Sequence, residues 1–221
     1  MSWKTHCVGR VMMSLPEDRP LTWSTGFNIA DVKRIPPLSE QQFWDGVEVV
    51  RQRYLTQKHE KTPTRLAHFE KVGSNAAFVF YYDNEASFIG PIMERYVYLD
   101  RDHAYEMRTG GVRTANVAPT PELFKPFVEK YTPIFSRIHP LAPGQFPNRD
   151  GLCIESAIIS GDTGRNASAA LISEIAFGTE LVVAYLENNY KVELLSGYEE
   201  LKFDEDHAKN PMGYDGPDAF K

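Results

Sequence analysis

The sequence predicts an α+β fold, in which helices pack on one face of an antiparallel sheet and a smaller strand-rich domain follows. Three observations carry this prediction. Short apolar segments are separated by close turns, which is typical of antiparallel strands. Two longer segments carry apolar residues at helical spacing instead. A proline-rich stretch, 139–147, then separates a long first part from a shorter second part that is rich in strand signals.

The first segments read as strands. Alternation over Cys7–Leu15 predicts a single strand, which Pro16 ends. The pattern over 21–35 predicts another strand or a bent hairpin, ended by two consecutive prolines. We therefore expect the chain to begin with β structure.

The first helix is predicted to begin at Ser39. Gln42 lies three residues further on, where the second partner of a capping box belongs. Apolar residues then recur at helical spacing, at Phe43, Val47, Val50 and Tyr54. This pattern predicts an amphipathic helix of about five turns that covers one face of the sheet.

A run of strand signals follows, at 65–72, 76–82, 92–99 and 104–109. Turn residues lie between consecutive segments, which favours an antiparallel meander. The segment 76–82 is apolar on both faces, as a central strand would be.

A second helix is indicated by Thr120-Pro121-Glu122 and by the apolar stripe that follows. Pro126 and Pro133 lie inside this stripe, and each removes an interior hydrogen bond. We therefore expect the helix to begin near Pro126 or to kink around Pro133.

We divide the chain into an N-terminal α+β domain, residues 1–143, and a short C-terminal strand-rich domain, residues 144–221. Strands are predicted in the second domain at 151–159, 169–177 and 180–186. The tail 199–221 is rich in acidic residues, glycine and proline, and we expect it to be loosely ordered.

Composition excludes several classes of function. The 221 residues include 24 Lys and Arg against 30 Asp and Glu, a formal charge of -6, which disfavours nucleic-acid binding through phosphate attraction. The longest apolar stretches fall far short of the ~20 residues of a membrane-spanning helix. The first residues also lack the apolar region of a secretory signal.

Catalytic patterns are absent from the sequence. Asp162-Thr163-Gly164 matches the aspartic-protease triplet but occurs once, so an exposed turn is favoured. The six histidines lack metal-ligand spacing, and His6 would point away from its neighbour Cys7 on a strand. We predict no catalytic, cofactor-binding or metal-binding residues and no cofactor, which favours a binding role over an enzymatic one.

The sequence has two cysteines, Cys7 and Cys153. Two thiols are too few for a structural zinc site without several histidine partners. Residue spacing alone leaves two interpretations open: a pair of buried free thiols, or a disulfide.

Two segments resemble a known family. Thr5–Pro16 is similar to the start of the bacterial immunity proteins that neutralise type VI secretion lipase effectors of the fourth class (the Tli family), in which a Cys-x-Gly-Arg strand ends in Leu-Pro. Arg149–Ile154 is similar to the Gly-Phe-Cys segment that opens the C-terminal domain of that family. Leu152 stands where Phe is usual, and 155–157 replaces an Asp/Glu-Gly-Gly stretch. The chain ends 68 residues after Cys153, short for that domain, so we expect a truncated member.

The resemblance implies a non-enzymatic immunity protein in the periplasm, whose partner is a cognate phospholipase effector and whose action is to occlude it. The charge and the short apolar stretches described above argue against a nucleic-acid partner and a membrane span, and the resemblance is compatible with a lipid anchor upstream. In an oxidising compartment a disulfide between Cys7 and Cys153 is favoured over free thiols. The residues that bind the partner are not identified.

Two other functions remain as alternatives at this point. One is a cell-envelope module that binds a small molecule or lipid, with Ala76–Tyr82 lining a pocket. The other is an enzyme with an unfamiliar site, using Asp162 or the region of His103.

Overall fold

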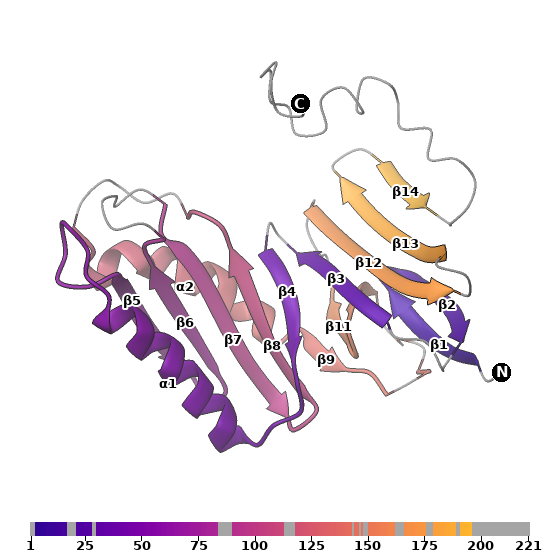
Figure 1. Ribbon diagram of the computed structural model, residues 1–221, viewed down its shortest axis with the longest axis horizontal. Coiled ribbons are helices and arrows are strands. Elements are labelled where there is room, and N and C mark those ends of the chain that lie inside the picture. Colours follow the sequence, from indigo (N-terminus) through magenta and orange to yellow (C-terminus); the bar gives the residue numbers. More distant parts are fainter. Residues whose placement is uncertain are drawn as a thin grey trace, which may run out of the picture.

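The chain folds around one long antiparallel sheet (Figure 1). The structure is a computed structural model, and it describes residues 3–16, 21–27, 30–83, 90–112, 118–142, 144–145, 147, 150–161, 166–175, 179–188 and 191–195. The predicted loosely ordered tail, 199–221, lies outside these residues.

In chain order the elements are β1 (Trp3–Val8), β2 (Val11–Pro16), β3 (Leu21–Phe27), β4 (Ala30–Ile35), α1 (Glu40–Thr56), β5 (Leu66–Val72), β6 (Ala76–Tyr81), β7 (Ile92–Asp100), β8 (His103–Thr109), α2 (Pro121–Phe135), β9 (Ile138–Pro140), β10 (Gly151–Ile154), β11 (Ala157–Ser160), β12 (Asn166–Ile175), β13 (Thr179–Asn188) and β14 (Lys191–Leu195).

The strands form three antiparallel sheets within the described residues. The largest has nine strands in the order β14-β13-β12-β3-β4-β8-β7-β6-β5. A small sheet has the order β10-β11-β9, and β1 pairs only with β2. The predicted meander is confirmed as β5–β8, and the segment 21–35 is the bent hairpin β3–β4.

The α+β class is confirmed, but the prediction that the helices share one face of the sheet is wrong. Every residue of β6 is buried, and its side chains alternate between two cores. Phe78 and Phe80 pack on the α2 side with Phe124, whereas Val79 packs on the α1 side with Phe43. A strand that is apolar on both faces needs a layer on each face, and one helix covers each (Figure 1).

Helix α1 begins where the capping box predicts. The Gln42 backbone N–H donates to Ser39 Oγ at 3.2 Å, and the Ser39 N–H donates to Gln42 Oε1 at 2.8 Å. Helix α2 begins at Pro121, so a start near Pro126 is wrong. Pro121 occupies the first turn, where a missing N–H costs nothing, and the exposed Pro126 and Pro133 lie within the helix.

Two predicted single strands are in fact hairpins. Cys7–Leu15 turns at Gly9 and Arg10, so that Val8 pairs with Val11. Gly9 has φ 62°, a conformation that glycine adopts without steric cost. The segment 151–159 likewise turns at 155–156. An apolar run on both sides of a two-residue turn resembles one continuous strand in the sequence.

Strand pairing crosses the proposed domain boundary at 143/144. Strand β12 pairs with β3 over seven residue pairs, and β11 pairs with β9. The division into residues 1–143 and 144–221 stays a prediction. Within the described residues, no helix is both long and apolar enough to cross a membrane.

Candidate functional site

Strands β3 and β4 separate partway along their length. They form only three residue pairs, from Phe27–Ala30 to Thr25–Val32. Beyond Thr25, β3 stays paired with β12 as far as Leu21, and β4 stays paired with β8 as far as Ile35. Each strand therefore follows its outer neighbour, and the sheet opens between them (Figure 1).

This opening forms the feature that we call the β3–β4 groove. One cavity of about 250 Å³ is lined by residues of β3, β4 and β8 together with Glu155. A second cavity of about 210 Å³ extends from it toward β1 and the disulfide. Trp23, Arg34 and Glu155 line both cavities, so the two lie side by side.

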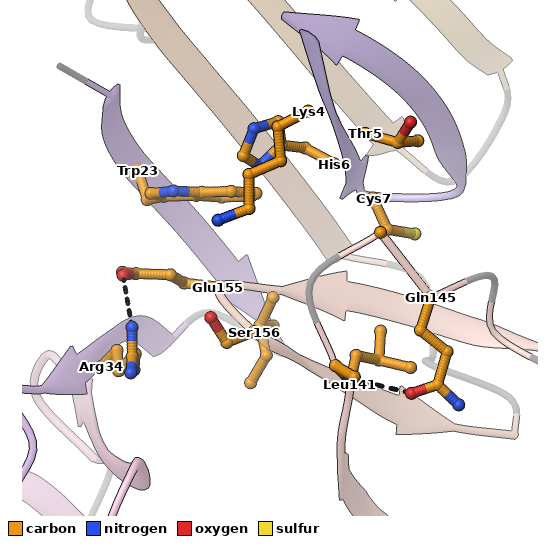
Figure 2. A pocket seen from close by; sticks show the side chains of 13 residues that line it. Lys4, Thr5, His6, Cys7, Trp23, Arg34, Leu141, Gln145, Glu155 and Ser156 are labelled. Carbon is orange, nitrogen blue, oxygen red and sulfur yellow. Dashed lines mark hydrogen bonds and ion pairs between the residues drawn. The ribbon is translucent and has the colours of Figure 1, made fainter. Parts of the chain in front are cut away.

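Arg34 and Tyr105 form one wall of the groove. They are direct partners in the β4–β8 register, so their side chains leave the same face of the sheet. Arg34 Nε donates to the Asp102 carbonyl oxygen at 3.0 Å, and Nη1 donates to Glu155 Oε1 at 3.3 Å. These two bonds hold the guanidinium at the groove, as Figure 2 shows for Glu155.

The turn between β10 and β11 forms the floor. The Tyr105 hydroxyl donates to the Glu155 carbonyl oxygen at 2.8 Å, and the Leu141 N–H donates to the Ser156 carbonyl oxygen at 2.9 Å. Burial raises the pKa of Tyr105, so the phenol keeps the proton that it donates. Ser156 has φ 59°, which costs energy for a residue with a side chain and is maintained by these bonds.

Lys4, His6 and Trp23 lie together at the other end of the groove (Figure 2). The His6 and Trp23 ring centroids are 6.1 Å apart. Burial, together with the nearby charge of Lys4, lowers the pKa of His6. His6 is therefore mostly neutral at pH 7, and the lasting positive charges of the groove are those of Lys4, Lys33 and Arg34.

The disulfide fixes this end of the groove. Cys7 and Cys153 are bonded, with their Cα atoms 5.7 Å apart, as the family resemblance implied. The Cys153 N–H also donates to the Gly9 carbonyl oxygen at 2.6 Å. The β1–β2 hairpin is thereby joined covalently and by a hydrogen bond to the small sheet.

The other residues considered in the sequence do not assemble into a site. His103 contacts Asp100 in the β7–β8 turn, with 2.7 Å between Nδ1 and Oδ1. Asp162 lies outside the described residues. The six side chains of β6 are packed into the two cores and line neither cavity of the groove. Within the described part of the chain, no cluster of three metal-binding side chains occurs.

Sequence reasoning missed the groove residues Trp23, Arg34 and Glu155. They come from three separate segments, and each is an ordinary strand or turn residue in its own segment. The only local signal is the departure from the family pattern at 155–157, which includes Glu155 and the turn residue Ser156.

Taken together, the fold is an α+β protein with a long antiparallel sheet that opens into a charged groove, a class of structure suited to binding another molecule. The chain shares this fold with solved immunity proteins. It matches a chain of the Tle4–Tli4 complex with a TM-score of 0.72 and 16% identity, covering 96% of this chain and 66% of the other.

It also matches the apo immunity protein TplEi of the type VI secretion system of Pseudomonas aeruginosa, with a TM-score of 0.70, 17% identity, and coverage of 97% and 68%. TplEi in complex with "L" peptide matches with a TM-score of 0.63 and 16% identity, covering 94% of this chain and 63% of the other. This chain thus spans about two thirds of the length of these proteins. By sequence it matches no protein-family model and no curated protein.

Proposed function

We propose that this protein is a non-enzymatic immunity protein that binds the phospholipase effector of a type VI secretion system and occludes its active site. The observation that carries the proposal is the fold, which agrees over nearly the whole chain with immunity proteins of that system. The two cysteine-containing segments, 5–16 and 149–154, support the same family independently, because their resemblance lies in the residues and not in the fold.

The partner in this proposal is a protein. One of the similar structures is a complex, Tle4–Tli4, and another contains TplEi with a peptide. A standard protein interface buries ~1,600 Å², and a few anchor residues supply most of its affinity. The β3–β4 groove offers a half-buried tryptophan and an arginine, the two residue types most enriched among such anchors.

The proposed compartment is the periplasm. A disulfide persists in oxidising compartments and is rare in the cytosol, so the bond between Cys7 and Cys153 supports a location outside the cytoplasm. A phospholipase that attacks from the periplasmic side would have to be neutralised there.

Co-expression tests this proposal. A phospholipase effector of the type bound in the similar Tle4–Tli4 complex is directed to the periplasm of a sensitive strain, with this protein either exported or kept in the cytoplasm. We expect survival only when the protein is exported, and a complex of the two purified proteins in gel filtration. Unchanged toxicity together with separate elution of the two proteins would show that the proposal is wrong.

A further inference from the structure

The groove exposes two strand edges that lack partners. A strand carries hydrogen-bonding groups along both edges. Residues 21–24 of β3 use one edge for β12, and residues 33–35 of β4 use one edge for β8. No backbone hydrogen bond between described residues joins these two segments. Their facing edges are therefore available to an added extended chain.

The space between these edges is not filled by side chains. The cavity of about 250 Å³ lies between β3 and β4, with Thr25 and Val32 at its closed end and the Glu155 turn below it. An extended peptide that enters such an opening gains main-chain hydrogen bonds from the strand edge and specificity from the pockets that receive its side chains.

The charge of the groove is opposite to that of the whole chain. The protein has a formal charge of -6, yet Lys4, Lys33 and Arg34 bring three lasting positive charges to the groove against the one carboxylate of Glu155. That carboxylate is already engaged by Arg34 at 3.3 Å. Lys33 is opposed by the nearby charge of Glu106. Among the described residues no ion pair involves Lys4, so its ammonium is the cation of the groove that an added carboxylate can meet.

A basic side chain is a poorer match for the same space. It would have to take Glu155 away from Arg34 while lying close to Lys4, and like charges brought together at an interface are unfavourable. An acidic side chain instead gains both cations. It can lie against the free ammonium of Lys4 and share Arg34, whose guanidinium has five N–H donors.

We propose that an extended, acidic segment of the effector enters the β3–β4 groove, bonds to the open edges at 21–24 and 33–35, and places a carboxylate between Lys4 and Arg34. This inference rests on the proposed function, because the segment belongs to the lipase partner. Trp23 lies beside Lys4 in the groove and supplies the apolar surface for the segment (Figure 2).

Calorimetry with the purified, disulfide-intact protein and the phospholipase effector of the co-expression test measures the contribution of the groove charge to binding. Lys4→Glu is compared with Lys58→Glu, the same change at an exposed lysine in the segment after α1, away from the groove. We expect the first variant to weaken binding about tenfold or more and the second to change it less than about threefold. Thermal unfolding midpoints of both variants establish that they are folded.

Hydrogen exchange of the wild-type protein tests the place of binding without any variant. We expect the amides of 21–24 and 33–35 that point into the groove, and not toward β12 or β8, to become protected in the complex. Equal affinities of the two lysine variants, or no protection at these amides, would overturn the groove assignment while leaving the immunity function intact. If the wild-type protein does not bind the lipase at all, the proposed function fails, and this inference fails with it.

Discussion

The guanidinium of Arg95 lies over the ring of Tyr131, with 4.7 Å between Arg95 Cζ and the ring centroid. Arg95 is fully buried on the α2 side of the sheet, and its Nη2 donates a hydrogen bond to Thr109 Oγ1 at 3.1 Å. Its Nε and Nη1 have no hydrogen-bond partner among the described residues. Burial lowers the pKa of Arg95 to about 10, although the nearby Tyr131 opposes the shift, so the charge is retained at neutral pH.

This buried charge leads to a prediction about stability. Replacing a buried charge with an apolar side chain of similar length removes its desolvation cost, and such changes are often neutral or stabilising. We expect Arg95→Met to leave the free energy of unfolding at pH 7 unchanged or raised by ~1 kcal/mol or more. Urea unfolding of the wild type and the variant measures this free energy. A loss of ~3 kcal/mol or more would show that the guanidinium stabilises the fold.

The disulfide leads to a second prediction, because it closes a loop of 146 positions. The chain-entropy model gives an upper figure of about 5 kcal/mol for such a loop, and measured losses are typically ~2–5 kcal/mol. We expect Cys7→Ala/Cys153→Ala to lose stability within that range, and reductant to destabilise only the wild type. Mass spectrometry of the wild-type protein, alkylated before any reductant is added, provides the control. If both cysteines are then fully alkylated, Cys7 and Cys153 are not bonded.

Gly151 and Gly46 form a matched pair for a third prediction. A Cβ at Gly151 would lie 2.3 Å from the Ile159 carbonyl oxygen across the β10–β11 hairpin, whereas one at Gly46 in α1 meets nothing within 4 Å. We expect Gly151→Ala to destabilise the protein by ~1–3 kcal/mol through overpacking. Gly46→Ala should stabilise it by ~0.5–1 kcal/mol, because alanine favours the helix. Thermal unfolding of both variants shows whether their stabilities change in opposite directions.

Glu106 leads to a prediction about pH. Burial, followed by the charge of Glu94, raises the pKa of Glu106 above its ordinary value, although Lys33 and Arg108 oppose the shift. Because the folded-state pKa is raised, the stability that this group contributes is complete at low pH and falls as pH rises through that pKa. We therefore expect Glu106→Gln to gain stability relative to wild type between pH 4 and pH 7.

Unfolding curves at a series of pH values measure this difference. Glu60→Gln, at an exposed position after α1, is the control, and its difference from wild type should stay nearly constant over the same range. A Glu106→Gln difference that is equally constant would show that burial does not affect this carboxyl.

Local features of the fold could be predicted because their causes lie close together in the sequence. The capping box of Ser39 and Gln42 placed the start of α1, and the unbroken apolar run of β6 indicated a strand covered on both faces. The second observation also implied that the helices lie on opposite faces, a consequence that the one-face prediction did not take into account.

The groove could not be predicted because it depends on where the hydrogen-bonded pairing of β3 with β4 ends. Trp23 and Arg34 border it only because β3 follows β12 and β4 follows β8 beyond Thr25 and Val32. Those pairings join distant segments and leave no periodic signal. The turn at Ser156 was equally hidden, since a serine with positive φ is held by tertiary hydrogen bonds and not by its own preference.

The pairing of β3 with β12 sets the order in which the molecule can be completed. Leu21 lies opposite Ser173, and Phe27 lies opposite Ala167, so a strand near the start of the chain acquires its neighbour only after most of the chain has been synthesised. Contacts between residues so far apart slow folding, because the intervening chain must be ordered first. The meander β5–β8 is therefore expected to form early, and the open groove would be among the last parts of the molecule to take shape.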